Sequence, residues 1–253
     1  MSAFPVRAVM LDASRVMENK RYYYDLLPWL NTWGYNSLHF HITDDQGSAL
    51  VFPSHPELAK DGAFTAEEMG SFVRCAEAQR IEVIPEIESF GHTRFITECP
   101  EFAHLGGDQE RGFNAIDPEH EDTQALLQDL FADTARIFTS EIIHVGLDEV
   151  NISCLPRYRE LPAEDRWKVF ASHASGVHDM VRDLNRRPAM WGDHILSAKE
   201  MISYFRDDVL ILDWHYTPDV SSSSLQFFCD NGFEVWAAPA SSSAVRTRAM
   251  PTQ

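Results

Sequence analysis

The chain has 253 residues, 44% of them hydrophobic, and its 39 acidic residues against 21 basic ones give a formal charge of −18. This length suits one large domain over residues 1–253 with a substantial core. The negative charge argues against nucleic acid and anionic membranes as partners, and no apolar run in the sequence is long enough to span a membrane.

The cysteines and the first residues bear on the compartment. Cys75, Cys99, Cys154 and Cys229 lie far apart and form no C-x-x-C pair. The N-terminus lacks the basic segment and apolar stretch of a secretory signal. Free thiols and the lack of such a signal predict a cytoplasmic protein.

Seven short apolar runs predict seven β-strands. In chain order they cover residues 6–12, 37–43, 81–87, 142–147, 188–191, 209–214 and 233–238. Several runs are rich in Val and Ile, which is typical of parallel strands buried on both faces.

Amphipathic stretches separate these runs and predict helices. Their residues are 22–33, 65–79, 123–138, 164–184, 198–205 and 223–231. Thr65 and Glu68 have the spacing of a capping box at the start of the second helix. Alternating strands and helices predict a parallel sheet with crossover helices.

Polar and charged residues gather where the predicted strands end. Because they follow six successive strands, from residues 12–15 to residues 213–216, they favour a (β/α)₈ barrel over a doubly wound sheet with one binding crevice. Only 15 residues follow Ala238, so we expect a barrel that lacks its last strand-helix unit. The first and seventh strands would then have unpaired edges that favour self-association as a homo-oligomer, with poor activity of the isolated chain.

Two adjacent carboxylates, Asp148 and Glu149, follow the fourth predicted strand. Cleavage of a glycosidic bond requires a proton donor to the leaving oxygen and stabilisation of an oxocarbenium-like carbon. Trp191 and Trp214 are expected to stack on a sugar ring, and charged groups after the first two strands are expected to bind its hydroxyls. The pattern favours glycoside hydrolysis.

Two alternatives stay open at this point. His39-x-His41 is typical of some metal-dependent barrel hydrolases, but alternate residues of a strand share one face, so these histidines equally fit a core position. The fourth and fifth strand ends lack the ligands that a bridged metal pair needs, and we therefore expect no metal and no cofactor. The other alternative is a sugar-binding barrel with little catalytic activity.

Four sequence motifs lie at the predicted strand ends. They are LDASR at residues 11–15, LHFHITDDQG at residues 38–47, GHT at residues 91–93 and HVGLDE at residues 144–149. Together they resemble the motifs of family 20 glycoside hydrolases, the β-N-acetylhexosaminidases. The resemblance covers residues 7–239 and implies a (β/α) barrel of the shorter, single-domain type.

The resemblance implies a retaining exo-hydrolase acting on oligosaccharides with a terminal GlcNAc or GalNAc, without deciding between the two. The substrate's acetamido oxygen would attack the anomeric carbon to form an oxazolinium intermediate. Asp148 would orient the acetamide, and Glu149, expected to be buried beside a negative charge, would act as acid and then base. Arg15 and Asp44 would bind sugar hydroxyls, with Glu88 and His92 in a second polar layer.

Several positions depart from the family pattern. Leu147 replaces the usual second glycine of the catalytic motif, Ser48 replaces a tryptophan, and Glu88 stands where aspartate is usual.

The largest departure follows the seventh strand, where Ser241 and Ser243 take the positions of a tyrosine and an aspartate. We expect either that Tyr216 replaces the tyrosine as hydrogen-bond donor to the acetamide, or that activity is weakened.

Overall fold

A computed structural model describes residues 4–107, 115–216 and 222–240 of the chain. Its main sheet has seven parallel strands that pair in chain order. They are β1 (Ala8–Asp12), β2 (Ser37–His41), β6 (Glu82–Glu86), β7 (Ile142–His144), β8 (Arg187–Trp191), β9 (Leu210–His215) and β10 (Val235–Pro239). The parallel sheet predicted from the sequence is confirmed.

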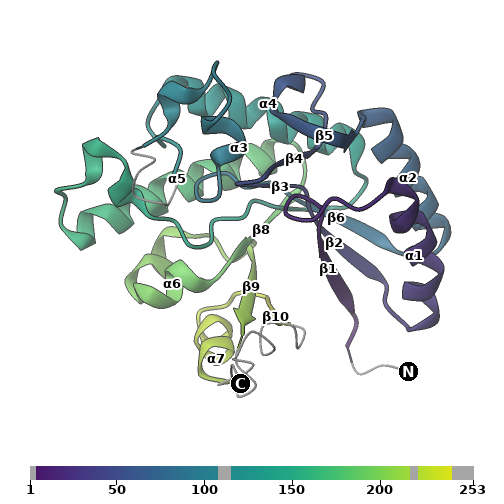
Figure 1. Ribbon diagram of the computed structural model, residues 1–253. Coiled ribbons are helices and arrows are strands. Elements are labelled where there is room, and N and C mark those ends of the chain that lie inside the picture. Colours follow the sequence, from purple (N-terminus) through teal and green to yellow (C-terminus); the bar gives the residue numbers. More distant parts are fainter. Residues whose placement is uncertain (1–3, 108–114, 217–221, 241–253) are drawn as a thin grey trace, which may run out of the picture.

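The sheet curls without closing in the described part of the chain. Strands β1 and β10 lie at its two ends, and each pairs with one neighbour only, β2 and β9 respectively. Figure 1 shows the curl, with helices on the outer, convex side and a gap between the two end strands. The predicted barrel without its eighth unit is the arrangement that these residues adopt.

Five longer helices connect the strands: α1 (Lys20–Thr32), α2 (Ala66–Ala78), α4 (Glu121–Ile137), α5 (Ala163–Asp183) and α7 (Ser222–Asp230). The predicted capping box is confirmed, because the Thr65 side chain accepts from the Glu68 N–H and the Glu68 carboxylate accepts from the Thr65 N–H. None of the described helices has the length and apolar character needed to cross a membrane.

Some elements were not predicted. A second sheet of three short strands, β3 (Thr43–Asp44), β4 (Gly47–Leu50) and β5 (Ala59–Phe64), follows β2. The predicted helix at residues 198–205 is a 3₁₀ helix, η6 (Lys199–Tyr204), and a separate α6 (Asp193–Ser197) precedes it. The remaining short elements are η1 (Pro56–Leu58), α3 (Arg94–Thr97), η2 (Ala103–Leu105), η4 (Ile152–Cys154) and η5 (Pro156–Tyr158).

The two faces of the main sheet differ in chemistry. Side chains such as Phe40, Val83 and Ile211 belong to the large buried cluster beneath the helices. The alternate residues of the strands point to the inner face, as the two-residue period requires. There a small apolar cluster of Ala189, Trp191, Leu210 and Leu212 covers the β8–β9 side, and histidines and a glutamate occupy the β2–β7 side.

Candidate active site

Five of the residues expected at the site follow four strands at the same edge of the sheet. Arg15 follows β1, Asp44 lies in β3 after β2, His92 follows β6, and Asp148 with Glu149 follows β7. The carboxyl ends of parallel strands share one edge, so the chain folds these distant residues together.

Arg15 and Asp44 form an ion pair at the β1–β2 side of the site. The Arg15 Nη2 atom lies 2.6 Å from Asp44 Oδ2, and Nη1 lies 2.9 Å from Asp12 Oδ2. Burial alone would raise the pKa of Asp44, but the hydrogen bond from His41 and the charge of Arg15 outweigh it and lower that pKa. Asp44 is therefore an anion that holds a half-exposed guanidinium in place.

His92 lies between two pairs of carboxylates. Its Nδ1 is 3.6 Å from Oδ2 of both Asp44 and Asp45, and its Nε2 is 3.7 Å from Asp148 Oδ2 and 3.4 Å from Glu149 Oε2. Burial lowers the pKa of His92, but the surrounding aspartates raise it to about 9. A cationic imidazole thus links the β2 and β7 loops.

The loop that carries His92 approaches the loop after β7 closely. A Cβ atom on Gly91 would lie 2.6 Å from the Asp148 carbonyl oxygen, so only glycine allows this contact. His92 itself has a φ of 49°, in the left-handed region that most side chains avoid. The backbone here is arranged to bring the imidazole to the carboxylate pair.

Asp148 and Glu149 differ in exposure, at 19% and 53% of their side chains. Burial raises the pKa of Asp148 to about 6, with His92 opposing and Glu86 and Asp193 adding to the rise. The burial expected for Glu149 is wrong, because its side chain is 53% exposed. Its φ is 48°, and its N–H donates to Asp193 Oδ2 at 3.1 Å. The more buried member of the pair is Asp148.

Glu88 lies fully buried beneath Asp148. Burial and the charges of Asp148, Glu86 and Asp44 raise the pKa of Glu88 well above its usual value. A Cβ atom on Gly146 would overlap the Glu88 carboxyl group at 2.0 Å, so this glycine makes room for it. Glu88, expected in a second polar layer with His92, therefore occupies the space that Gly146 leaves.

Sequence reasoning did not single out Glu86, which forms the centre of a buried ionic cluster. Its carboxylate lies 2.9 Å from His39 Nε2, 2.8 Å from His41 Nδ1 and 3.2 Å from His144 Nδ1, and it accepts the Trp191 indole N–H at 2.6 Å. The signal was Glu86 itself, a charged residue inside an apolar run, which requires a partner.

Protonation within this cluster is uneven. Burial lowers the pKa of His41, but Glu86 and Asp44 on its two ring nitrogens raise it to about 10, whereas burial lowers that of His144 to about 4. Burial would also raise the pKa of Glu86, but the three histidines hold it well below its usual value. His41 therefore connects the cluster to Asp44 as a cation, 3.3 Å from Asp44 Oδ2.

The two tryptophans expected to stack on a sugar ring differ in burial. Trp191 is only 6% exposed and packs below the site. Trp214 is half-buried, and its ring centroid lies 4.8 Å from that of exposed Tyr216. Burial raises the pKa of Tyr216, and the charges of Glu149 and Asp148 add to the rise while that of Arg15 opposes it. The substituted positions Ser241 and Ser243 lie outside the described residues.

Comparison with known proteins identifies the family. Residues 4–242 match the sequence profile described as "Glycosyl hydrolase family 20, catalytic domain". The chain belongs to glycosyl hydrolase family 20. Beta-hexosaminidase subunit alpha of Mus musculus is 25% identical over 233 residues, covering 83% of this chain and 43% of that protein. Beta-hexosaminidase 1 of Coccidioides posadasii is 24% identical over 241 residues, covering 84% and 40%.

Solved structures support the fold of this family 20 domain. It superposes on the exo-β-N-acetylglucosaminidase of Vibrio harveyi with a TM-score of 0.79, at 22% identity, over 94% of this chain and 42% of that chain. The Flavobacterium johnsoniae chitobiase gives a TM-score of 0.81 at 22% identity, over 94% and 38%. The chain spans about two fifths of the length of the curated relatives it matches.

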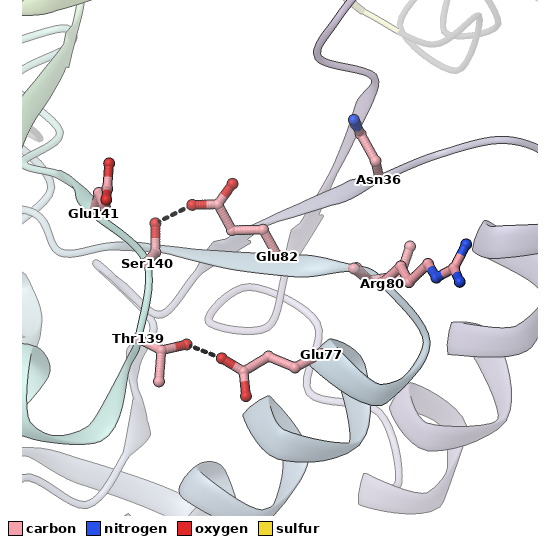
Figure 2. Close-up of a pocket in the computed structure, with 8 residues that line it drawn as sticks. Asn36, Glu77, Arg80, Glu82, Thr139, Ser140 and Glu141 are labelled. Atoms are coloured by element: carbon pink, nitrogen blue, oxygen red, sulfur yellow. Dashed lines mark hydrogen bonds between the residues drawn. The ribbon is translucent and has the colours of Figure 1, made fainter.

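A surface hollow of about 520 Å³ lies away from the family 20 site. It is lined by Asn36, Glu77, Arg80, Ile81, Glu82, Thr139, Ser140 and Glu141. These residues precede or begin β2, β6 and β7, so the hollow is at the opposite edge of the sheet from the carboxylate pair. Figure 2 shows the hydrogen bonds that the Ser140 hydroxyl donates to Glu82 and the Thr139 hydroxyl donates to Glu77 at this hollow.

Proposed function

We propose that the chain is a retaining exo-β-N-acetylhexosaminidase that removes a terminal N-acetylhexosamine from oligosaccharides. The observation that carries the proposal is the carboxylate pair of Asp148 and Glu149, one buried and one exposed, with cationic His92 within 3.7 Å of both. The beta-hexosaminidases among its relatives support the same substrate class.

The first step breaks the glycosidic bond. The Glu149 carboxyl group donates its proton to the glycosidic oxygen while the bond from that oxygen to the anomeric carbon breaks. The substrate's acetamido oxygen forms the new bond to the anomeric carbon, which gives a cyclic oxazolinium ion. Asp148 accepts a hydrogen bond from the acetamide N–H and stabilises the positive charge.

The second step returns the site to its starting state. The Glu149 carboxylate takes a proton from water as the water oxygen attacks the anomeric carbon and the oxazolinium ring opens. Two displacements at the same carbon retain its configuration, and no carboxylate of the chain forms a covalent bond to the sugar.

Asp148 has the properties that this role requires. Its Oδ1 atom is buried and has no hydrogen-bond partner among residues 4–107, 115–216 and 222–240, so an acceptor is free for an amide N–H. Its pKa of about 6 leaves it mainly ionised above that pH. An exposed Glu149 is open to both the leaving group and the incoming water.

The sugar-binding groups surround this pair. Arg15, held by Asp44, presents guanidinium N–H groups that suit hydroxyl recognition. Trp214 and Tyr216 offer an aromatic surface with a hydroxyl at its rim, and we assign to Tyr216 the hydrogen bond to the acetamido oxygen. Trp191 closes the floor of the site beneath the ring.

The test compares Glu149→Gln with wild type on two N-acetylglucosaminides, one with a good aryl leaving group and one with a poor alkyl leaving group. A good leaving group needs little protonation, so its rate should fall far less than that of the alkyl substrate. Glu141→Gln, in the opposite hollow, is the matched control and should retain both rates. Equal losses on both substrates would remove Glu149 from the acid role, and sugar binding without turnover in wild type would favour the weak sugar-binding barrel.

A further inference from the structure

A second cluster of potential metal ligands lies outside the site described above. His104 in η2, His120 at the N-cap of α4 and Asp122 in its first turn can each place one ligand atom within 4.8 Å of the other two. The His104 and His120 rings lie edge to face, with centroids 5.2 Å apart. We propose that these three residues bind one transition-metal dication of the Zn²⁺ class.

The geometry is close to that of a bound site. His104 Nε2 lies 2.9 Å from Asp122 Oδ2, and His120 Nδ1 lies 3.8 Å from the same oxygen. Two imidazoles and one carboxylate are a ligand set that Zn²⁺ uses in sites with an open fourth position. Imidazole nitrogens favour Zn²⁺, Cu²⁺ and Ni²⁺, whereas Mg²⁺ and Ca²⁺ favour oxygen ligands.

The backbone holds the two histidines together before any ion binds. The Asp117 N–H donates to the Leu105 carbonyl at 2.7 Å, and Gly106 and Ile116 form an antiparallel bridge. His104 directly precedes buried Leu105, and His120 directly precedes α4. Binding therefore requires side-chain rotation but no rearrangement of the chain.

Two local interactions must be exchanged on binding. His120 Nδ1 caps the helix by accepting a hydrogen bond from the Asp122 N–H at 3.2 Å. Asp122 Oδ2 is hydrogen-bonded to His104 Nε2 at 2.9 Å. Both are exposed interactions of small net value, and metal–ligand bonds replace them. The three side chains are 47%, 37% and 55% exposed for His104, His120 and Asp122, so an ion reaches them from solvent and water completes its coordination.

A neighbouring histidine provides a matched contrast. His55 also contacts two carboxylates, but Glu57 lies at its Nδ1 and Asp129 at its Nε2, both at 3.2 Å. The two carboxylates lie at different ring nitrogens of His55, so an ion bound to one nitrogen cannot be bound by both carboxylates. His55 therefore has acidic neighbours, as His104 does, without the convergent geometry of the proposed site.

The experiment is calorimetric titration of the untagged 253-residue chain with ZnCl₂, together with thermal denaturation at increasing zinc concentration. Wild type should bind zinc at a site that raises its Tm, since a ligand of the native state stabilises it. His104→Ala and Asp122→Asn should each weaken this binding about tenfold or more and remove the Tm rise. His55→Ala should bind as wild type does, and MgCl₂ should not substitute for zinc.

Three outcomes would overturn the proposal. The first is that wild type takes up no zinc at micromolar concentrations in the titration. The second is that His104→Ala and Asp122→Asn bind zinc as wild type does, which would assign the ion to the buried histidines or to His92. The third is that His55→Ala weakens zinc binding as much as these two variants do. Circular dichroism of the variants checks folding, and His104→Gln, which keeps the polar contact to Asp122 without an imidazole, serves if His104→Ala is unfolded.

Discussion

Leu147 provides a quantitative test of how the loop after β7 is built. It is fully buried, yet its φ is 77°. It lies between Gly146, with a φ of 69°, and the candidate pair of Asp148 and Glu149, of which Glu149 has a φ of 48°. A side chain in the left-handed region costs roughly 1–2 kcal/mol. Burial of the leucine side chain contributes about 2–5 kcal/mol to stability, judged by the cost of Leu→Ala changes in protein cores. Because this contribution exceeds the cost of the strain, leucine is tolerated at this position.

The perturbation is a pair of variants, Leu147→Ala and Leu147→Gly. Both lose the buried side chain, so both should be less stable than wild type by about 2–5 kcal/mol. Glycine relieves the strain of roughly 1–2 kcal/mol but loses about 0.5–1 kcal/mol through its flexible unfolded state. Leu147→Gly should therefore be more stable than Leu147→Ala by about 0.5–1 kcal/mol.

The assay is thermal unfolding followed by circular dichroism, where about 1 kcal/mol corresponds to roughly 2–4 °C for a chain of this size. Val145, two residues earlier, is equally buried but is not among the residues of positive φ, so it is the control. There glycine should be less stable than alanine, the opposite order. If Leu147→Gly is the less stable of its pair, the account of the strained loop is refuted.

Three other outcomes are expected. His92→Gln should flatten the fall in Tm between pH 6.5 and about 9. The raised pKa of His92 stabilises the native state below pH 6.5, and this contribution is lost as the pH rises through about 9. A wild-type profile of Tm against pH in the variant would contradict this reasoning. Plain β-glucosides should react far more slowly than N-acetylglucosaminides, and Asp148→Asn should slow the latter; comparable rates on both sugars would exclude substrate assistance. Light scattering of the 253-residue chain should show self-association through β1 and β10, whose outer edges are unpaired in the described structure; a fully active monomer would disprove this.

The main sheet could be predicted because each strand is a short apolar run that ends in polar residues. The runs at residues 81–87 and 188–191 coincide with β6 and β8 to within one residue. The three-stranded sheet could not be predicted, because β3 and β4 have only two and four residues, and β3 falls within a motif that was interpreted for its chemistry. Their pairing depends on the turn between Asp44 and Gly47, which periodicity does not reveal.

Which residues belong to the candidate site could be predicted from the strand ends, but which of their side chains are buried and which are exposed could not. Sequence alone places Asp148 and Glu149 side by side, and only the structure shows that Glu149 is the more exposed of the two. The same holds for Trp191, whose indole N–H is directed to Glu86 from a strand more than 100 residues away. Such contacts depend on sheet register and side-chain direction, which a single sequence leaves open.

The order of strands in the main sheet has a consequence for how the chain folds. Each strand pairs with the one formed before it, from β1 to β10, so every unit leaving the ribosome meets an edge that is already present. Glu86 is joined first to the β2 histidines, then to His144, and only later to Trp191. The cluster is therefore complete only when β8 brings the indole N–H to the carboxylate that β2 and β7 already contact.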